Sequence, residues 1–407
     1  MKKLSFLISL LCLLFISGSL NAQSTSITNY TTANGLPDDY VSGGVVVDQD
    51  NNKWFGTANG VARFSETEVW TVFTTTDGVI SNYISAIAVD KMNNVWVGSD
   101  DGVSKFDGTD WTSYTTADGL VDNAVIYIHG DPNGGVWFAT YTGVSRLYNS
   151  TWTTFTSVNG LPTDAVNCIA SDSLGNTWFG TLMGGAAYYD GTDFTVINIS
   201  TGLPDDNVFA IGVDASNNKY IGTWYGITKL DNSNNVVTTY DTASCNIYND
   251  FTRDIQFDNA GNMWAGFFAD YNQDGGVSFF NGISWTNFST DEGLVNKQVI
   301  RLALDDQYVW VATGMGVSRI FFNSGVADHS FSNVKCKTYP NPVQDYLTIE
   351  PENISVTITI SDLSGKQLLQ ESFNSAGEMD TRMLNAGMYL LQISDGSQIQ
   401  SSKLIVE

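Results

Sequence analysis

A short aromatic strand motif recurs seven times along this chain of 407 residues, at steps of 42, 41, 41, 42, 44 and 46 residues. The first copy reads Trp54-Phe55-Gly56-Thr57, and the later copies begin at Trp96, Trp137, Trp178, Tyr220, Trp264 and Trp310. Four strand-like runs, separated by turns rich in Asn, Asp and Gly, fill each period. A period in the forties built from strands and turns is typical of propeller blades. The repeat therefore predicts an all-β, seven-bladed β-propeller.

The seventh copy lacks its fourth strand, because no Trp-Thr-x-Phe run follows residues 316–320. The N-terminal residues 27–32 align instead with the fourth strand of the second copy, residues 111–116. We therefore expect the first strand to complete the last blade and to close the ring. Closure hides the sheet edges that would otherwise pair with other chains.

The N-terminal residues 1–22 are typical of a secretory signal peptide. Lys2 and Lys3 form the basic start, an apolar stretch follows, and Asn21-Ala22 offers a cleavage site. The apolar stretch is too short to anchor the chain in a bilayer, and we expect no transmembrane segment after signal removal. The formal net charge of −25 excludes nucleic acid and anionic membrane surfaces as partners, because their phosphates would be repelled.

The blade consensus runs Gly-Leu-Pro, then Asp-x-x-(Gly/Asn)-Asn-x-Trp-x-Gly-Thr, then Gly-Val-Ser-x-Phe. This pattern resembles the two-component-regulator propeller repeats of Bacteroidetes over residues 27–325. The resemblance implies the ligand-binding part of a periplasmic sensor kinase. We expect no later transmembrane helix and too little further chain for a kinase, so signalling in cis is not expected here.

The period stops after Phe331, and a different unit begins. We expect the propeller over residues 23–326, a linker over 327–336 and a small β-sandwich over 337–407. The motifs of this last unit are Tyr339-Pro340-Asn341-Pro342, Leu347-Thr348-Ile349, Gly387-Met388-Tyr389 and Lys403-Leu404-Ile405-Val406. They resemble the C-terminal sorting domain of type IX secretion. The resemblance implies that this unit contacts the type IX secretion machinery and that the protein passes through the periplasm to the cell surface or the medium.

The sequence offers little for catalysis, and we predict no catalytic residue. Only two histidines occur, His129 and His329, and neither a Gly-x-Ser-x-Gly elbow nor zinc-ligand spacing is present. An Asp stands five or six residues before each blade aromatic. Seven copies at one repeat position indicate a structural role, in which the carboxylate accepts hydrogen bonds from turn amides.

Positions that differ between blades within a shared loop are free to contact a ligand. The loop before the first strand and the loop between the second and third strands lie on one face of a propeller. Trp224 is the only Trp outside the two repeated Trp registers. The predicted ligand-binding residues are Asp39, Tyr40, Asn82, Tyr83, Asn123, Tyr141, Asp164, Asp206, Trp224, Tyr225, Asn249 and Lys297. Aromatic rings interleaved with Asp and Asn suit sugars, although Asx residues that merely cap the loops would give the same pattern.

One insertion in the sixth blade, Asp270-Tyr271-Asn272-Gln273-Asp274-Gly275, matches the start of a calcium loop. Its twelfth position is Asn281 rather than Glu, which favours a plain polar loop. We therefore expect no cofactor, with calcium at Asp270, Asn272 and Asp274 as the alternative.

These features together predict a secreted or surface-displayed, non-catalytic binding module, with carbohydrate as the ligand. Two alternatives stay open. The same face could carry a propeller-type polysaccharide lyase or hydrolase, or the propeller could be an accessory sensor or adhesion scaffold that contacts another protein.

Overall fold

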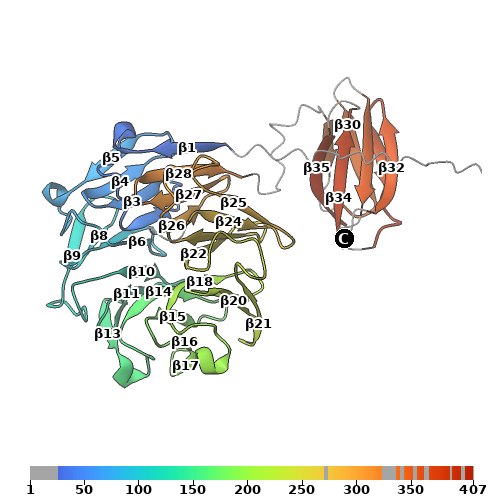
Figure 1. Ribbon diagram of the computed structural model, residues 1–407. Coiled ribbons are helices and arrows are strands. Elements are labelled where there is room, and N and C mark those ends of the chain that lie inside the picture. The colour runs from blue at the N-terminus through green and yellow to red at the C-terminus, as the bar shows by residue number, and fades with distance from the viewer. Residues whose placement is uncertain are drawn as a thin grey trace, which may run out of the picture.

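The computed structural model describes residues 26–269, 274–322, 336–339, 343–351, 355–361, 366–385, 387–395 and 399–406. The predicted signal peptide and most of the predicted linker lie outside these ranges. Strands dominate the described residues, which form seven four-stranded antiparallel sheets and two further sheets near the C-terminus (Figure 1). The predicted seven-bladed all-β fold is confirmed.

The blades are numbered in chain order, and each runs from its innermost to its outermost strand. Blades one to three contain β2 (Gly44–Val47), β3 (Lys53–Thr57), β4 (Gly60–Phe64), β5 (Trp70–Phe73); β6 (Ala86–Val89), β7 (Val95–Gly98), β8 (Val103–Phe106), β9 (Trp111–Tyr114); and β10 (Tyr127–Gly130), β11 (Val136–Ala139), β12 (Val144–Tyr148), β13 (Thr151–Phe155). Blades four and five contain β14 (Val166–Ser171), β15 (Thr177–Thr181), β16 (Ala186–Tyr189), β17 (Phe194–Ile197); and β18 (Val208–Val213), β19 (Lys219–Thr223), β20 (Gly226–Leu230), β21 (Val236–Tyr240).

Blade six contains β22 (Thr252–Phe257), β23 (Met263–Phe267), β24 (Val277–Phe280) and β25 (Trp285–Phe288), and blade seven contains β26 (Val299–Leu304), β27 (Tyr308–Thr313), β28 (Gly316–Phe321) and β1 (Ile27–Tyr30). The first strands of successive blades contact one another around the ring, and β2 also contacts β26. Figure 1 shows these strands surrounding the centre of the propeller.

The fourth strand of blade seven comes from the N-terminal end of the propeller. β1 pairs antiparallel with β28, in a register that sets Ile27 opposite Ile320 and Tyr30 opposite Val317. The Tyr30 ring is buried and stacks on Trp310 of the same blade at 5.7 Å between centroids. It also contacts Trp70 of blade one at 5.9 Å. Tyr30 therefore packs between the last blade and the first.

The repeated Asp and the repeated Trp form the same contact in six blades, and in blade five the Tyr220 hydroxyl donates to Asp214 Oδ2 at 3.3 Å instead. In blade four, Asp172 Oδ1 accepts hydrogen bonds from the Leu174 and Asn176 amides, and Asp172 Oδ2 accepts one from Trp178 Nε1 at 3.0 Å. The same indole-to-carboxylate bond occurs at Trp54, Trp96, Trp137, Trp264 and Trp310. The predicted turn role of these Asp residues is confirmed, and the structure adds that six of them also satisfy the N–H of a buried Trp.

Short 3-10 turns stand at the entry to four blades. They are η1 (Thr32–Asn34), η2 (Thr75–Asp77), η3 (Ser157–Asn159) and η4 (Ile199–Thr201). Each ends at a Gly with positive φ, which a residue with a Cβ rarely adopts. These turns lie on the same side as the loops between second and third strands, because backbone bonds such as Gly60 N to Asn82 O join the two sets.

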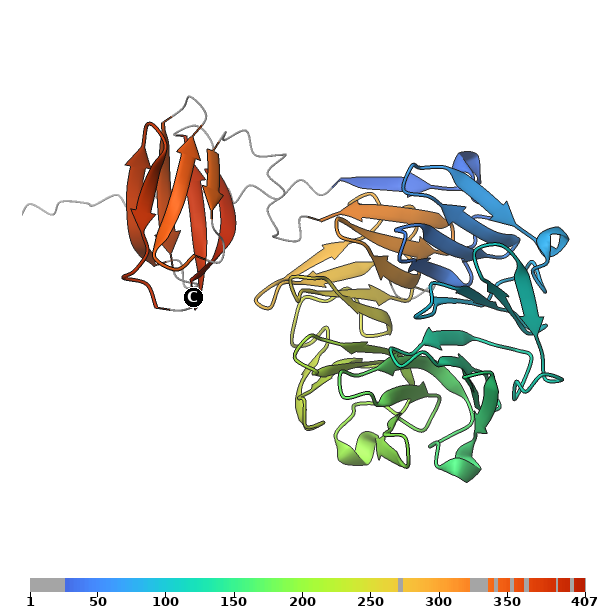
Figure 2. The same ribbon diagram turned by 180° about the vertical axis from the view of Figure 1, so that it is seen from behind.

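The C-terminal unit contains two sheets. One is formed by β29 (Cys336–Tyr339), β30 (Tyr346–Pro351) and β33 (Gly377–Asp380), and the other by β32 (Gln367–Phe373), β31 (Val356–Ser361), β34 (Gly387–Ser394) and β35 (Ile399–Val406). Leu347 and Ile349 of the first sheet share one buried cluster with Ile358, Ile360 and Leu391 of the second. The strands of this unit are drawn in red in Figure 2. Within the described part of the chain, no helix has the length and apolar character needed to cross a membrane.

Candidate ligand-binding site

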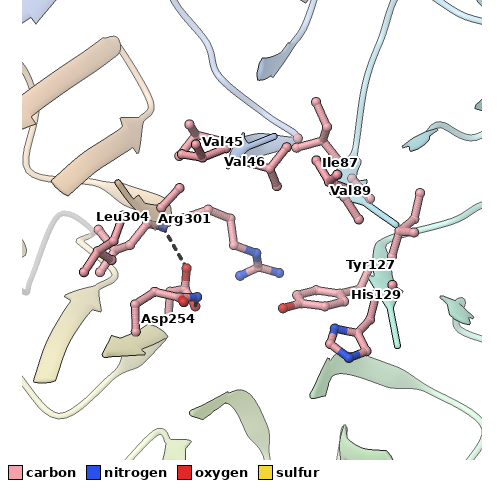
Figure 3. Close-up of a pocket in the computed structure, with 18 of the residues that line it drawn as sticks. Val45, Val46, Ile87, Val89, Tyr127, His129, Asp254, Arg301 and Leu304 are labelled. Carbon is pink, nitrogen blue, oxygen red and sulfur yellow. Dashed lines mark hydrogen bonds between the residues drawn. The ribbon is translucent and has the colours of Figure 1, made fainter. Parts of the chain in front are cut away.

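The inner strands differ most at the position that pairs with the Gly or Ala near the end of each second strand. From blade one to blade seven this position holds Gly44, Ala86, Tyr127, Cys168, Ala210, Asp254 and Arg301. Four small residues therefore leave room on the propeller axis, and three large polar residues project from the remaining blades. A cavity of about 360 Å³ lies along the axis beside them (Figure 3).

Arg301 crosses from blade seven toward blade three. Its aliphatic stem packs over Gly44, where an added Cβ would lie 2.7 Å from Arg301 Cβ. Gly44 has a φ of +90°, so both space and backbone favour glycine there. The guanidinium carbon lies 4.7 Å from the centre of the Tyr127 ring, which is a cation–π contact (Figure 3). Arg301 Nη1 also donates to the Arg253 carbonyl oxygen at 3.1 Å.

Asp254 is the acidic member of this layer, and its carboxylate holds blades six and seven together. Oδ2 accepts a hydrogen bond from the Leu302 amide of blade seven at 2.7 Å. Oδ1 accepts from the Ile255 amide at 2.9 Å and from Gln256 Nε2 at 3.3 Å. The hydrogen-bond donors to this carboxylate are therefore backbone and side-chain amide groups rather than an arginine.

Arg253 stands next to this layer, toward the face that carries the loops. It occupies a β-bulge, since the pairing of β22 with β23 shifts register between Thr252 and Asp254. Its Nε is buried and has no hydrogen-bond partner among the described residues. Burial, followed by the charge of Arg301, lowers the pKa of Arg253 to about 10, so the guanidinium stays charged at neutral pH.

Three half-exposed tyrosines lie in loops on this face, from blades one, two and three. The exposed fractions of Tyr40, Tyr83 and Tyr141 are 39%, 44% and 58%. Tyr40 and Tyr141 lie within electrostatic range of the Arg253 guanidinium. Burial and then the neighbouring Tyr40 raise the pKa of Tyr83. The structure thus brings together three of the predicted aromatic residues and adds an arginine that the repeat pattern did not indicate.

Five of the predicted Asx residues cap loop backbone. Asp39, Asn82, Asn123, Asp164 and Asp206 each accept a hydrogen bond from the amide seven residues earlier, at 2.6 to 2.8 Å. These bonds hold the loop that enters the blade against its own 3-10 or turn segment. The capping alternative therefore accounts for the described contacts of these five side-chain oxygens.

Asn249 and Lys297 differ from the other loop residues. In blade six the capping bond goes from the Thr242 amide to Asp250 Oδ1 at 2.7 Å, one residue later than expected. The blade-six loop is one residue longer at this point, so Asn249 is not equivalent to Asp206. Instead, Asn249 Nδ2 donates to the Phe268 carbonyl oxygen at 2.7 Å. Lys297 is equivalent to Asp206 but forms a partly exposed ion pair with Asp274, at 2.7 Å.

Trp224 is packed more firmly than the sequence suggested. The ring stacks on Phe251 of blade six, with 4.5 Å between centroids and 14° between planes, and meets Phe209 edge-on at 5.7 Å. Even so, 48% of the residue is exposed, and the neighbouring Tyr225 is 61% exposed. Trp224 lies outside the repeated Trp registers, and its support comes instead from an aromatic cluster particular to blades five and six.

The calcium alternative falls largely outside the described residues, which omit Asp270 and Asn272. Asp274 is exposed and carries the ion pair with Lys297. Within the described ranges, no group of three or more His, Cys, Asp or Glu side chains could hold a metal ion. His129 lines the axial cavity, where its Nε2 lies 2.8 Å from Ser171 Oγ. Burial lowers the pKa of His129 to about 4, so the imidazole is neutral at pH 7.

The repeat pattern gave no indication of Arg253, Arg301, Tyr127 or Asp254. Each occurs once, so no repeat signal marks it. Aligning the inner strands blade by blade reveals three of them, as large polar residues at a position otherwise held by Gly, Ala and Cys.

The chain thus contains a seven-bladed propeller with an axial cavity, followed by a C-terminal β unit, and family models match segments of both. Residues 337–407 match the secretion system C-terminal sorting domain, and residues 78–101 and 160–182 match the two component regulator propeller. Both resemblances are confirmed. The sorting domain indicates export to the cell surface or beyond and implies contact with the secretion machinery. No curated protein sequence matches the chain significantly.

Solved structures share the fold at low identity. One is the extracellular domain of BT3049, described as a hybrid two-component system from B. thetaiotaomicron, with 17% identity and a TM-score of 0.64 over 93% of this chain and 57% of that one. Another is PorZ, a surface component of the type IX secretion system of Porphyromonas gingivalis, with 17% identity and a TM-score of 0.61 over 91% and 60%. Virginiamycin B lyase from Staphylococcus aureus has 12% identity and a TM-score of 0.59 over 74% and 100%. The chain spans less than two thirds of the first two proteins.

Proposed function

We propose that this protein is a non-catalytic binding module, displayed on the cell surface or released, whose propeller loop face binds carbohydrate. The observation that carries the proposal is the set of half-exposed tyrosines on the loop face, Tyr40, Tyr83 and Tyr141, of which Tyr40 and Tyr141 lie within electrostatic range of Arg253. Aromatic faces stack on the apolar faces of sugar rings, and hydroxyl and guanidinium groups bind sugar oxygens. A site of a few polar groups among aromatic walls is typical of small-ligand binding.

Ten of the twelve predicted loop residues divide into two roles within this proposal, and Asn249 instead donates to the Phe268 carbonyl oxygen. Tyr40, Tyr83, Tyr141, Trp224 and Tyr225 contact the ligand, because each keeps a large exposed ring surface. The Asx residues act through the loops, because their hydrogen bonds hold the loop backbone on which the aromatic residues are mounted. Lys297 lies at the edge of this face, where it pairs with Asp274.

Screening the whole mature chain against a glycan array tests the proposal. The double variant Tyr40→Ala/Tyr141→Ala should lose binding to any glycan that the wild type retains. Tyr148→Ala is a matched control, because Tyr148 is 40% exposed, close to the 39% of Tyr40, but ends β12 on the other side of the blade. Equal loss in both variants, or binding that survives the double variant, would contradict the proposed face.

The same array separates the alternatives. Release of product from a bound glycan would favour a lyase or hydrolase, and binding without turnover supports the module. The neutral, hydrogen-bonded state of His129 favours binding, because a histidine with a pKa near 4 is a poor general acid at neutral pH. A protein ligand would be favoured if no glycan is retained.

We further propose that export depends on residues 337–407. A chain without them should fold as a propeller but stay in the periplasm, as cell fractionation and immunoblotting would measure. Normal amounts of that truncated protein in the medium would refute this assignment.

A further inference from the structure

Two arginines meet on the axis of a strongly acidic protein. The chain has 18 Lys and Arg residues against 43 Asp and Glu residues, yet Arg253 and Arg301 lie side by side at the loop-side end of the channel. Arg301 donates to the backbone carbonyl of Arg253, which fixes the two residues relative to each other. The charge of Arg301 lowers the pKa of Arg253 and the charge of Asp254 raises it, so two arginines stand against one carboxylate in this layer.

Asp254 offsets part of the charge of Arg253 through space but accepts no hydrogen bond from its guanidinium. Asp254 is adjacent in sequence, but its carboxylate accepts hydrogen bonds from the Ile255 and Leu302 amides and from Gln256. The Arg253 guanidinium donates no hydrogen bond to any residue in the described part of the chain, and its Nε is buried. Burying a charged donor without a partner is costly, so a ligand that supplies an acceptor is favoured.

A comparison with other arginines shows that Arg253 is different. Arg63, Arg146 and Arg319 also bury an Nε without a partner. However, each of these donates through an Nη atom, to Thr71, to Asp131 and to Glu68 respectively. Each of them also lies over an aromatic ring of the blades. Those three arginines belong to the scaffold, whereas Arg253 lies within electrostatic range of Tyr40 and Tyr141 of the loop face.

We propose that the ligand of this face is acidic, and that Arg253 binds an oxyanion of a glycan, either a uronate carboxylate or a sulfate ester. This rests on the proposed carbohydrate function and adds the charge class of the sugar. The planar guanidinium matches two oxygens of a carboxylate or sulfate at once. Arg301 stands behind it, held over Tyr127, and contributes a second positive charge. The Tyr40, Tyr83 and Tyr141 rings then contact the sugar ring that bears the acidic group.

A glycan array with matched neutral and acidic members tests this inference on the whole mature chain. We expect the acidic members to bind, and Arg253→Gln to weaken their binding about 10- to 100-fold, the usual range for one hydrogen bond to a charged group. Arg63→Gln removes an arginine with the same buried Nε elsewhere in the propeller and should leave binding unchanged. Neutral glycans that bind wild type and Arg253→Gln equally would overturn the inference while leaving the proposed carbohydrate function intact.

Thermal unfolding gives a second measurement that needs no known glycan. Sulfate is excluded from protein surfaces and stabilises any fold, so the test is a difference. Sodium sulfate, compared with sodium chloride at equal ionic strength, should raise the melting temperature of the wild type more than that of Arg253→Gln, and Arg63→Gln should respond as the wild type does. Without sulfate, Arg253→Gln should melt no lower than the wild type, because it removes a buried, like-charged neighbour of Arg301. If no glycan binds, the carbohydrate proposal fails, and the sulfate effect alone decides the anion site. An equal rise in the wild type and in Arg253→Gln, or a large loss of stability in Arg253→Gln, overturns it.

Discussion

The two ends of each blade differ in how closely the seven copies of the repeat agree. At the turn end, every blade has the Asp, which binds turn amides and, in six blades, the indole N–H of a buried Trp. In blade five the Tyr220 hydroxyl replaces the indole. At the loop end, one inner-strand position changes from Gly44 to Tyr127 to Arg301 around the ring. The repeated contacts build the scaffold, and the residues that break the repeat provide the channel chemistry.

Burial follows the same division. Trp178 is fully buried and donates to Asp172, whereas Trp224 keeps 48% of its surface exposed on the loop face. Both are Trp, so their difference comes from position alone. Variants that act at one end of the blades should therefore change stability, and variants at the other end should change binding.

The largest effect should come from opening the ring. Deleting residues 23–33 removes β1 and with it Tyr30, which packs between blades seven and one. The loss of unfolding free energy should exceed the roughly 3–5 kcal/mol that truncating one large buried aromatic costs. Denaturant unfolding measures it. Tyr30→Ala alone should give a smaller loss, and an unchanged melting temperature for the deletion would show that blade seven is stable with three strands.

Truncating a scaffold Trp should rank second. Trp178→Ala removes a fully buried side chain and leaves the Asp172 carboxylate without its indole donor, so we expect a loss of about 3–5 kcal/mol. Trp178→Phe fills most of the cavity and should recover more than half of this loss. Equal damage from both substitutions would mean that the hydrogen bond, rather than the packing, dominates.

The scaffold can be predicted from the sequence because each of its contacts recurs. The constant Asp–Trp spacing predicts the turn role of the Asp residues, and the missing fourth strand of blade seven points to residues 27–32. The meeting of Arg253, Arg301 and Tyr127 cannot be predicted this way, because it depends on ring closure bringing distant blades across one axis. The insertion in the blade-six loop likewise moves the capping role from Asn249 to Asp250.

Protonation of the buried carboxylates at the turn end should lower the stability of the fold more than protonation of carboxylates in exposed turns. Burial raises the pKa of Asp131, but hydrogen bonds from Arg146 and from the Gly135 amide outweigh it, so the pKa lies below its usual value. A carboxylate with a lowered folded-state pKa stabilises the fold above its unfolded pKa of about 4 and loses that effect as pH falls through the folded value. Asp131→Asn should therefore lower the free energy of unfolding by about 1–3 kcal/mol at pH 7. Below about pH 4, the variant should lose less further stability than the wild type does.

Asp190 provides the control for this pH effect. Its pKa is also lowered, by the Asp193 and Thr192 amides, but it lies in an exposed turn. Asp190→Asn should lose stability with falling pH about as the wild type does, because solvent screens exposed charges. Melting temperatures from pH 7 to pH 2 would compare the two variants, and equal slopes for Asp131→Asn and Asp190→Asn would contradict a special role for the buried carboxylate.

The smallest change in stability, and the most specific change in binding, is expected at Trp224. Its stack on Phe251 is an aromatic pair with one open face, so Trp224→Ala should cost only about 1 kcal/mol of stability. If the open face stacks on the ligand, the same variant should weaken glycan binding by about 1–3 kcal/mol, the scale of aromatic hot spots. Trp224→Phe keeps a ring on Phe251 and should retain most of both. Titration calorimetry with a glycan taken from the array measures the binding, and thermal unfolding of the same variants measures the stability. A stability loss as large as that of Trp178→Ala would place Trp224 in the scaffold. The three tyrosines would then remain as the binding surface.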